Sequence, residues 1–112
     1  MIAKAILRDP DAHRRNKTEE AFWQMQLLRV RAGEILYCYW EPFNLRFADS
    51  VYYKIDCLVI ELDATITLYE VKGYFTEAGR RKVKVAARLF PYFRIIVATW
   101  PKKQWHYEPI GR

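Results

Sequence analysis

Three charged residues, Asp56, Glu70 and Lys72, occur in a stretch whose pattern predicts a β-hairpin. Apolar residues alternate along both arms with the period of strands that bury one face; they are Leu58, Ile60, Leu62, Ile66 and Leu68. With the turn at residues 63–65, Asp56 faces Lys72 and Leu58 faces Glu70. Diagonal neighbours on a sheet lie roughly 7–8 Å apart, so the two carboxylates can converge on one cation. The pattern therefore predicts a metal site at the end of an apolar face.

A helix that precedes this hairpin carries a further carboxylate. Asn16 and Glu19 have the spacing of a capping box, and Gly33 closes a predicted helix over residues 17–32. Apolar residues recur along this helix at helical spacing: Ala21, Met25, Leu28 and Ala32. We expect this stripe to pack on the apolar face of the hairpin, which would bring Glu19 toward the two carboxylates of the hairpin.

The whole pattern predicts an α/β fold with a mixed β-sheet flanked by helices, in the order α-β-β-β-α-β. Strands are expected at residues 35–40 and 43–47 and in the two arms of the hairpin, and a basic amphipathic helix follows over residues 76–90. A buried strand over residues 93–99 then forms a right-handed β-α-β crossover with the second arm of the hairpin. Residues 105–110 can add an edge strand.

Length and composition restrict the class of protein. A chain of 112 residues that is 52% hydrophobic predicts one folded domain over residues 1–112, with a core at 16–99 and a flexible basic arm at 1–15. The net charge of +6 makes a polyanion a natural partner. Cys38 and Cys57 lack zinc-ligand spacing, so we expect reduced core residues. Because no run has the apolar length of a signal peptide or a membrane span, we expect a cytoplasmic protein.

A helical glutamate, an aspartate in a strand and a Glu-x-Lys motif in the next strand, followed by a helix and a strand, resemble the PD-(D/E)XK nuclease superfamily. Here these residues are Glu19, Asp56 and Glu70-Val71-Lys72. Within the superfamily, residues 16–19, residues 70–73 and the basic helix look most like small phage-type endonucleases, including junction-resolving ones. Ile55 stands before the aspartate where the family has proline. The resemblance implies a restriction-endonuclease-like fold, a bacterial or phage-infected host cell, and a homodimer that cuts branched DNA such as a Holliday junction.

The resemblance also implies a role for each of these residues. Asp56 and Glu70 would bind Mg²⁺, for which Mn²⁺ can substitute. Glu19 and the backbone carbonyl of Val71 would complete the metal site. Lys72 would orient the attacking water or stabilise the charge that develops on the phosphate. Glu19, Asp56, Glu70 and Lys72 are thus the catalytic residues expected of a Mg²⁺-dependent endodeoxyribonuclease that hydrolyses phosphodiester bonds.

Basic residues close to these motifs are expected to contact DNA phosphates, although a solvated helix face explains the same charges. They are Lys17, Arg80, Arg81, Lys82, Lys84 and Arg88. The four tryptophans offer surfaces for stacking on unpaired bases, and core packing explains them as well; they are Trp23, Trp40, Trp100 and Trp105.

Plainer interpretations remain open for the acidic residues. Glu19 can serve only as part of a helix cap, with Glu20 as its substitute if the helix is rotated. Glu70 and Lys72 can form an ordinary salt bridge on a solvated strand. The alternative function is a non-catalytic DNA-binding or assembly module that keeps the nuclease-like fold and the basic surface without turnover.

Overall fold

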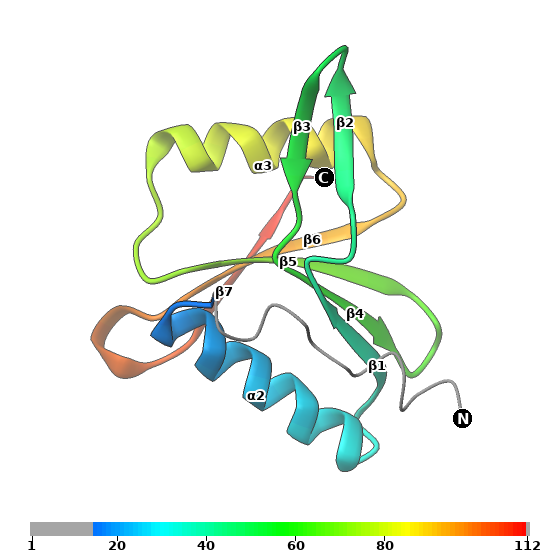
Figure 1. Ribbon diagram of the computed structural model, residues 1–112, viewed down its shortest axis with the longest axis vertical. Helices are drawn as coiled ribbons and strands as arrows, with labels where there is room; N and C mark the ends of the chain where they lie inside the picture. The colour runs from blue at the N-terminus through cyan, green and yellow to red at the C-terminus, as the bar shows by residue number, and fades with distance from the viewer. Residues whose placement is uncertain (1–14, 112) are drawn as a thin grey trace.

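The computed structural model describes residues 15–111, so the arm predicted at residues 1–15 lies outside the described residues except for Arg15. In chain order the elements are α2 (Lys17–Arg31), β1 (Ile35–Trp40), β2 (Asn44–Ala48), β3 (Val51–Lys54), β4 (Cys57–Glu61), β5 (Ile66–Lys72), α3 (Glu77–Leu89), β6 (Arg94–Thr99), the 3₁₀ turn η2 (Pro101–Lys103) and β7 (His106–Ile110). Figure 1 shows their arrangement. No helix within residues 15–111 has the length and apolar character needed to cross a membrane.

Five strands form a mixed sheet in the order β1-β4-β5-β6-β7, and β2 and β3 form a separate two-stranded sheet. Strands β1, β4 and β5 are antiparallel, β6 joins β5 in parallel, and β7 pairs with β6 as an antiparallel edge strand. The predicted α/β class with a mixed sheet is confirmed. Five strands precede α3, more than the predicted order α-β-β-β-α-β contains. The strand expected at residues 43–47 is present as β2, and the strand that was not expected is β3, which pairs with β2.

The predicted helices are confirmed to within one residue at each end. Asn16 caps α2: its side chain accepts a hydrogen bond from the N–H of Glu19, and the Glu19 carboxylate accepts one from the N–H of Asn16. Gly33 follows the helix with a φ of 76°, the left-handed conformation that glycine adopts without strain. Thr76 caps α3 by accepting a hydrogen bond from the N–H of Gly79.

The register of the β4–β5 hairpin differs from the prediction by two residues. Leu58 pairs with Leu68, whereas the prediction set it opposite Glu70. Because side chains alternate with a period of two, a shift of two residues leaves every side chain on its predicted face. If the pairing is continued by one position beyond Cys57 and Tyr69, Asp56 lies opposite Glu70 rather than opposite Lys72. The correction therefore brings the two carboxylates closer together than the sequence prediction did.

The cause of the shift is the position of the turn, which is centred on Asp63 rather than on Ala64: the N–H of Glu61 donates a hydrogen bond of 2.9 Å to the carbonyl of Thr65 and closes residues 62–64. Asp63 stabilises the turn because its carboxylate accepts hydrogen bonds from the backbone N–H and the hydroxyl of Thr65, at 3.0 and 2.7 Å. Ala64 has a φ of 72°, which is uncommon for a residue with a Cβ atom. Turn geometry of this kind is not visible in a hydrophobic pattern.

Helix α2 packs on the face of the sheet opposite to the one predicted. Its buried residues are Phe22, Trp23 and Gln26, whereas Ala21 and Leu28 of the predicted stripe are exposed. The sheet residues in the same core are Cys38, Cys57, Val59, Tyr69, Val71, Ile96 and Ala98. Two adjacent aromatic side chains bury more apolar area than the predicted stripe, and this decides the rotation of the helix. Both cysteines are free and buried, as expected.

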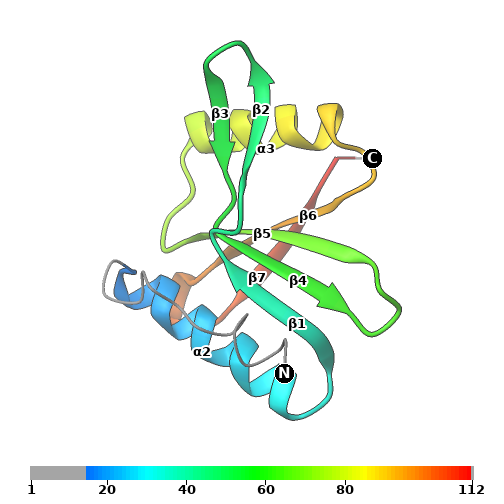
Figure 2. The ribbon, with the colours of Figure 1, turned by 45° about the vertical axis from the view of Figure 1, so that its right-hand side comes forward.

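Helix α3 covers the other face, the one that carries the apolar residues of the hairpin. Val83 and Ala86 pack there against Leu58 and Leu68. The β2–β3 hairpin projects past α3 in both ribbon views (Figures 1 and 2), and its Tyr53 enters the same core. The sheet therefore separates two cores, and the base of the β2–β3 hairpin lies on the α3 side.

Candidate active site

Asp56 lies in the short link between β3 and β4 and is 7% exposed. Its Oδ2 atom accepts a hydrogen bond of 2.8 Å from the backbone N–H of Val71, and its backbone carbonyl accepts one of 2.7 Å from the N–H of Glu41. Both bonds hold Asp56 against its neighbours, the end of β1 and the end of β5. The carboxylate is thus fixed at the edge of the pairing between β4 and β5.

Glu70 of β5 is equally buried, at 7% exposed, and both of its carboxylate oxygens have partners. The hydroxyl of Tyr53 donates a hydrogen bond to Oε1, and the Nζ atom of Lys72 lies 3.2 Å from Oε2. The side chain of Lys72 is 44% exposed, so it links the buried carboxylate to solvent. Asp56, Glu70 and Lys72 are therefore brought together as the sequence predicted, although in a different register.

Burial and mutual repulsion change the ionisation of this group. Burial, and then the charge of Glu70, raise the pKa of Asp56 to about 7, against the lowering effects of the Val71 N–H and of Lys72. Burial by itself would lower the pKa of Lys72, but the carboxylates of Glu70 and Asp56 outweigh it and raise that pKa. Lys72 is therefore held as an ammonium ion, and the Asp56 carboxyl is close to half-protonated at neutral pH.

Tyr53 is the member of this group that the sequence analysis missed. It is 8% exposed, and its ring stacks on Phe47 with centroids 5.8 Å apart. Burial, followed by the charge of Glu70, raises the pKa of the Tyr53 hydroxyl far above its ordinary value, so the phenol keeps the proton that it donates. Tyr53 is one of two adjacent tyrosines in a short strand, and nothing in that spacing distinguishes a hydrogen-bond donor from a core residue.

Glu19 lies near this group, although α2 presents another face to the sheet than expected. Its carboxylate closes the capping box by accepting the N–H of Asn16 at 3.0 Å. Its charge also reaches the site, since it raises the pKa of both Asp56 and Lys72. Glu19 thus has the structural role of a cap and also contributes negative charge to the candidate site.

Glu20, the substitute considered for Glu19, is engaged elsewhere. Its carboxylate accepts hydrogen bonds from Gln24 and from Arg15, whose Nε atom lies 2.9 Å away. The side chain of Arg15 is 2% exposed, and its guanidinium lies over the rings of Trp23 and Trp40, 5.3 Å from each centroid. Arg15 is therefore packed against α2, and the rest of the arm predicted at residues 1–15 lies outside the described residues.

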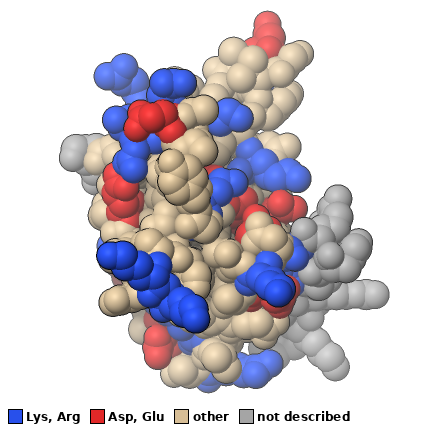
Figure 3. Space-filling model, turned by 90° about the vertical axis from the view of Figure 1, so that its left-hand side faces the viewer, with Lys and Arg blue, Asp and Glu red and all other residues tan. Residues whose placement is uncertain are grey.

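The basic residues expected to contact DNA differ in their surroundings. Arg80 pairs with Glu108 of β7 and lies over the ring of Phe75, 5.0 Å from its centroid. The others are exposed: Lys17, Arg81, Lys82, Lys84 and Arg88. Figure 3 shows the side of the molecule where the loops after β5 and β6 lie, with basic atoms at the height of α3 and again lower down, and acidic atoms between them. The structure therefore leaves most of these cations available to a polyanion.

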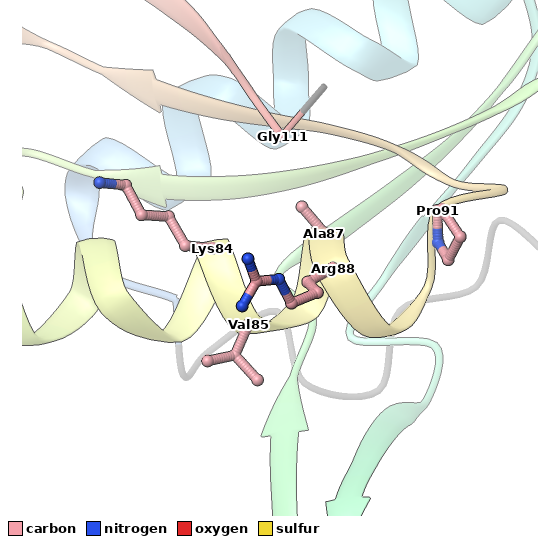
Figure 4. Close-up of a pocket in the computed structure, with 6 residues that line it drawn as sticks. All are labelled: Lys84, Val85, Ala87, Arg88, Pro91 and Gly111. Carbon is pink, nitrogen blue, oxygen red and sulfur yellow. The ribbon is translucent and has the colours of Figure 1, made fainter.

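Lys84 and Arg88 border a shallow pocket between α3 and the end of β7. Figure 4 shows Ala87 pointing toward Gly111, while Val85 points away from it. A Cβ atom on Gly111 would lie 2.7 Å from that of Ala87, and Gly111 has a φ of 84°. Glycine at this position therefore lets the segment after β7 pass close to α3.

Asp56 and Glu70 form a two-carboxylate arrangement rather than a closed metal cage. Within residues 15–111, no group of three or more His, Cys, Asp or Glu side chains is gathered closely enough to hold a metal ion. Two carboxylates suit a hard cation that retains several waters, whereas zinc sites use His and Cys ligands. Comparisons with family models, with curated proteins and with solved structures found no match to this chain.

Proposed function

We propose that this chain is a Mg²⁺-dependent endodeoxyribonuclease of the PD-(D/E)XK type. The observation that carries the proposal is the pair of buried carboxylates, Asp56 and Glu70, beside the ammonium group of Lys72. The order of elements supports it as well, because α2, the antiparallel strands β1, β4 and β5, and the β5-α3-β6 crossover follow the order of a restriction-endonuclease-like core.

The donor set fits Mg²⁺, which proteins bind through one or two carboxylates while it keeps several waters. Asp56 and Glu70 would hold the ion, and Glu19 and the backbone carbonyl of Val71 are the further ligands that we expect. A cation at this position would relieve the repulsion that contributes to the raised pKa of Asp56. When bound, it would supply stabilisation of phosphate charge and a more acidic water.

The chain's own residues then have distinct roles. Lys72 would stabilise negative charge on the phosphate or orient the attacking water. In the metal-free protein the carboxylates of Glu70 and Asp56 raise its pKa, so it is an ammonium ion there. Tyr53 fixes the position of the Glu70 carboxylate through its hydrogen bond. The exposed cations of α3 neutralise neighbouring phosphates of the DNA without reading its sequence.

The first prediction concerns Glu70→Gln, which keeps the shape of the side chain but removes its charge. We expect cleavage of supercoiled, linear and branched DNA in Mg²⁺ to fall by roughly 10²–10³-fold, the loss typical of removing one electrostatic contribution to a transition state. DNA binding should change little, and circular dichroism should show that the variant remains folded. The matched control is Glu77→Gln, an exposed glutamate in the first turn of α3. Undiminished cleavage by Glu70→Gln would contradict the proposal.

The second candidate function is a non-catalytic DNA-binding or assembly module, and the exposed cations of α3 favour it. The same panel of DNA substrates separates the two functions. Binding by the wild-type protein without nicking in either Mg²⁺ or Mn²⁺ would establish the module and exclude the nuclease. Action as a homodimer on junction DNA is a further expectation from the resemblance, and sedimentation of the complex would test it.

A further inference from the structure

We propose that a small cavity with aromatic walls, at the same end of the sheet as the candidate active site, binds one unpaired nucleobase of DNA. The cavity has a volume of about 140 Å³ and is lined by Lys17, Thr18, Ala21, Trp100 and Trp105. This inference rests on the proposed action on DNA and specifies the kind of DNA, namely a strand with at least one base outside a regular duplex.

Two tryptophans provide the stacking surface. The ring centroids of Trp100 and Trp105 are 4.8 Å apart and the rings are tilted by 55°. Trp105 is held in place by Phe22 of α2, whose ring meets it edge-on with the ring centroids 5.3 Å apart. Trp100 is 36% exposed, so part of its surface remains open to a ligand. A supported ring and an open ring together form a platform on which a planar base can stack.

The size of the cavity favours a single base over a larger ligand. Pockets that enclose whole drug-sized molecules measure roughly 300–1,000 Å³, well above the 140 Å³ found here. The opposite wall is made by α2, where Thr18 offers a hydroxyl that can donate and accept hydrogen bonds. A cavity of this size with two aromatic walls and the hydrogen-bonding groups of Thr18 and Lys17 suits a single base.

The cavity lies at the end of the sheet that carries the proposed site of hydrolysis, on the face covered by α2, whereas Asp56 and Glu70 share the α3 face with Leu58 and Leu68. Trp100 directly follows Thr99, which pairs with Lys72 in the parallel register of β5 and β6. On the other wall, a Cβ atom on Gly73 would lie 3.6 Å from the hydroxyl of Thr18, so the start of α2 borders the residue that follows Lys72. A strand whose phosphate reaches Lys72 thus has this cavity within reach of a neighbouring base.

The charges around the cavity match a nucleic acid strand. Lys17 lines the cavity itself, and the η2 turn between the two tryptophans presents Lys102 and Lys103. Both of these lysines are exposed and have left-handed φ values of 54° and 59°, which are uncommon outside glycine. One lysine therefore lines the aromatic cavity and two more lie in the turn that joins its two tryptophans. Cations beside aromatic rings are the combination by which proteins bind single-stranded DNA without reading its sequence.

A base inside a duplex cannot enter such a cavity, because both of its faces are stacked and its edge is paired. Extracting it costs a few kcal/mol, and the cost is smallest for a mismatched or already unpaired base. The cavity thus predicts a preference for bulges, single-stranded ends and branch points over continuous duplex. This preference is separate from the chemistry at Asp56 and Glu70.

The test uses the full chain in EDTA, so that binding is measured without cleavage. Two labelled duplexes are compared, one with a single unpaired adenine and one with an abasic residue at the same position. We expect the wild-type protein to bind the adenine duplex roughly 5- to 150-fold more tightly, the range for one base–aromatic stack. Trp100→Ala should abolish the difference and Trp100→Phe should restore most of it. The control is Tyr92→Ala, which removes another exposed aromatic ring and should leave the preference unchanged.

A second variant guards against an effect of Trp100→Ala on folding. Ala21→Leu fills the cavity from the exposed side of α2 without removing a stacking surface, and it should abolish the preference as well. Equal affinity of the wild-type protein for the two duplexes, or a preference that survives both variants, would overturn the inference. If the protein cuts DNA but shows no such preference, the base site is excluded and the nuclease proposal stands. If the protein shows the preference in EDTA but cuts no DNA in Mg²⁺, the nuclease is excluded and the base site stands.

Discussion

At the scale of the residue, Asp56 is the group whose ionisation depends most on the fold. Its pKa is raised from 3.8 to about 7 in the folded protein. The folded state then binds a proton more tightly than the unfolded state, so the unfolding free energy of the metal-free protein should fall as the pH rises from 3.8 to about 7. At lower pH both states are protonated at this position, and the contribution of Asp56 is fully present.

This sign leads to a prediction for Asp56→Asn, which keeps an oxygen acceptor for the Val71 N–H. In EDTA at pH 8 the variant should unfold at a higher temperature than the wild-type protein, and its stability should vary less between pH 4 and 8, because the buried charge is gone. Thermal melts across this pH range provide the measurement, with Asp49→Asn in an exposed turn as the control. A lower melting temperature for Asp56→Asn at pH 8 would show that the charge is stabilised in the metal-free protein.

Tyr53 allows a second test at this scale. Tyr53→Phe removes the hydroxyl that donates to Glu70 and leaves a buried carboxylate oxygen without that donor. We expect a loss of about 1–3 kcal/mol in the unfolding free energy. We also expect a decrease of roughly 10–100-fold in Mg²⁺ affinity or cleavage, as is typical when a metal-binding carboxylate loses its supporting hydrogen bond. Urea unfolding and titration with Mg²⁺ measure the two effects.

The neighbouring residue supplies a matched control for that experiment. Tyr52→Phe makes the same chemical change in the same strand, at a side chain that is 59% exposed. It should alter neither quantity, since an exposed hydroxyl exchanges its partner for water. Equal effects of the two variants would remove Tyr53 from the site.

At the scale of the element, the rotation of α2 is the feature most open to measurement. Phe22→Ala empties a fully buried position and should cost about 3–5 kcal/mol of unfolding free energy. Leu28→Ala changes a residue that is 59% exposed and should stay within about 0.5 kcal/mol of the wild-type protein. Urea unfolding of both variants distinguishes the two faces of the helix. A larger loss of unfolding free energy for Leu28→Ala than for Phe22→Ala would show that the stripe of Ala21, Met25 and Leu28 is the buried face.

At the scale of the whole molecule, one end of the sheet brings together segments far apart in the chain. The start of α2, the end of β3, the start of β4 and the end of β5 meet around Asp56 and Glu70. The parallel strand β6 adds Trp100 on the opposite side of the same end. The ion pair of Arg80 and Glu108 connects the start of α3 to the edge strand β7. Charge, candidate ligands and aromatic surface are thus concentrated where several elements end.

Local sequence signals predicted the elements themselves. The capping box of Asn16 and Glu19, the glycine at position 33 and the basic amphipathic pattern of residues 76–90 act within a few residues of the chain, and the structure confirms each of them. Alternation with a period of two likewise identified which residues of the hairpin share a face. The association of Asp56, Glu70 and Lys72 followed from that alternation, because a shift of two residues does not change the face.

The tertiary structure decided what depends on contacts between distant segments. The register of β4 and β5 follows from a turn centred on Asp63, and the rotation of α2 follows from the burial of Phe22 and Trp23 against the sheet. The bond from Tyr53 to Glu70 and the cavity at Trp100 each join elements that are separated in sequence. By itself, the sequence determined the elements and the shared face of the charged residues, because helix caps and strand alternation are local; packing decided their partners, since these contacts exist only once the sheet has formed.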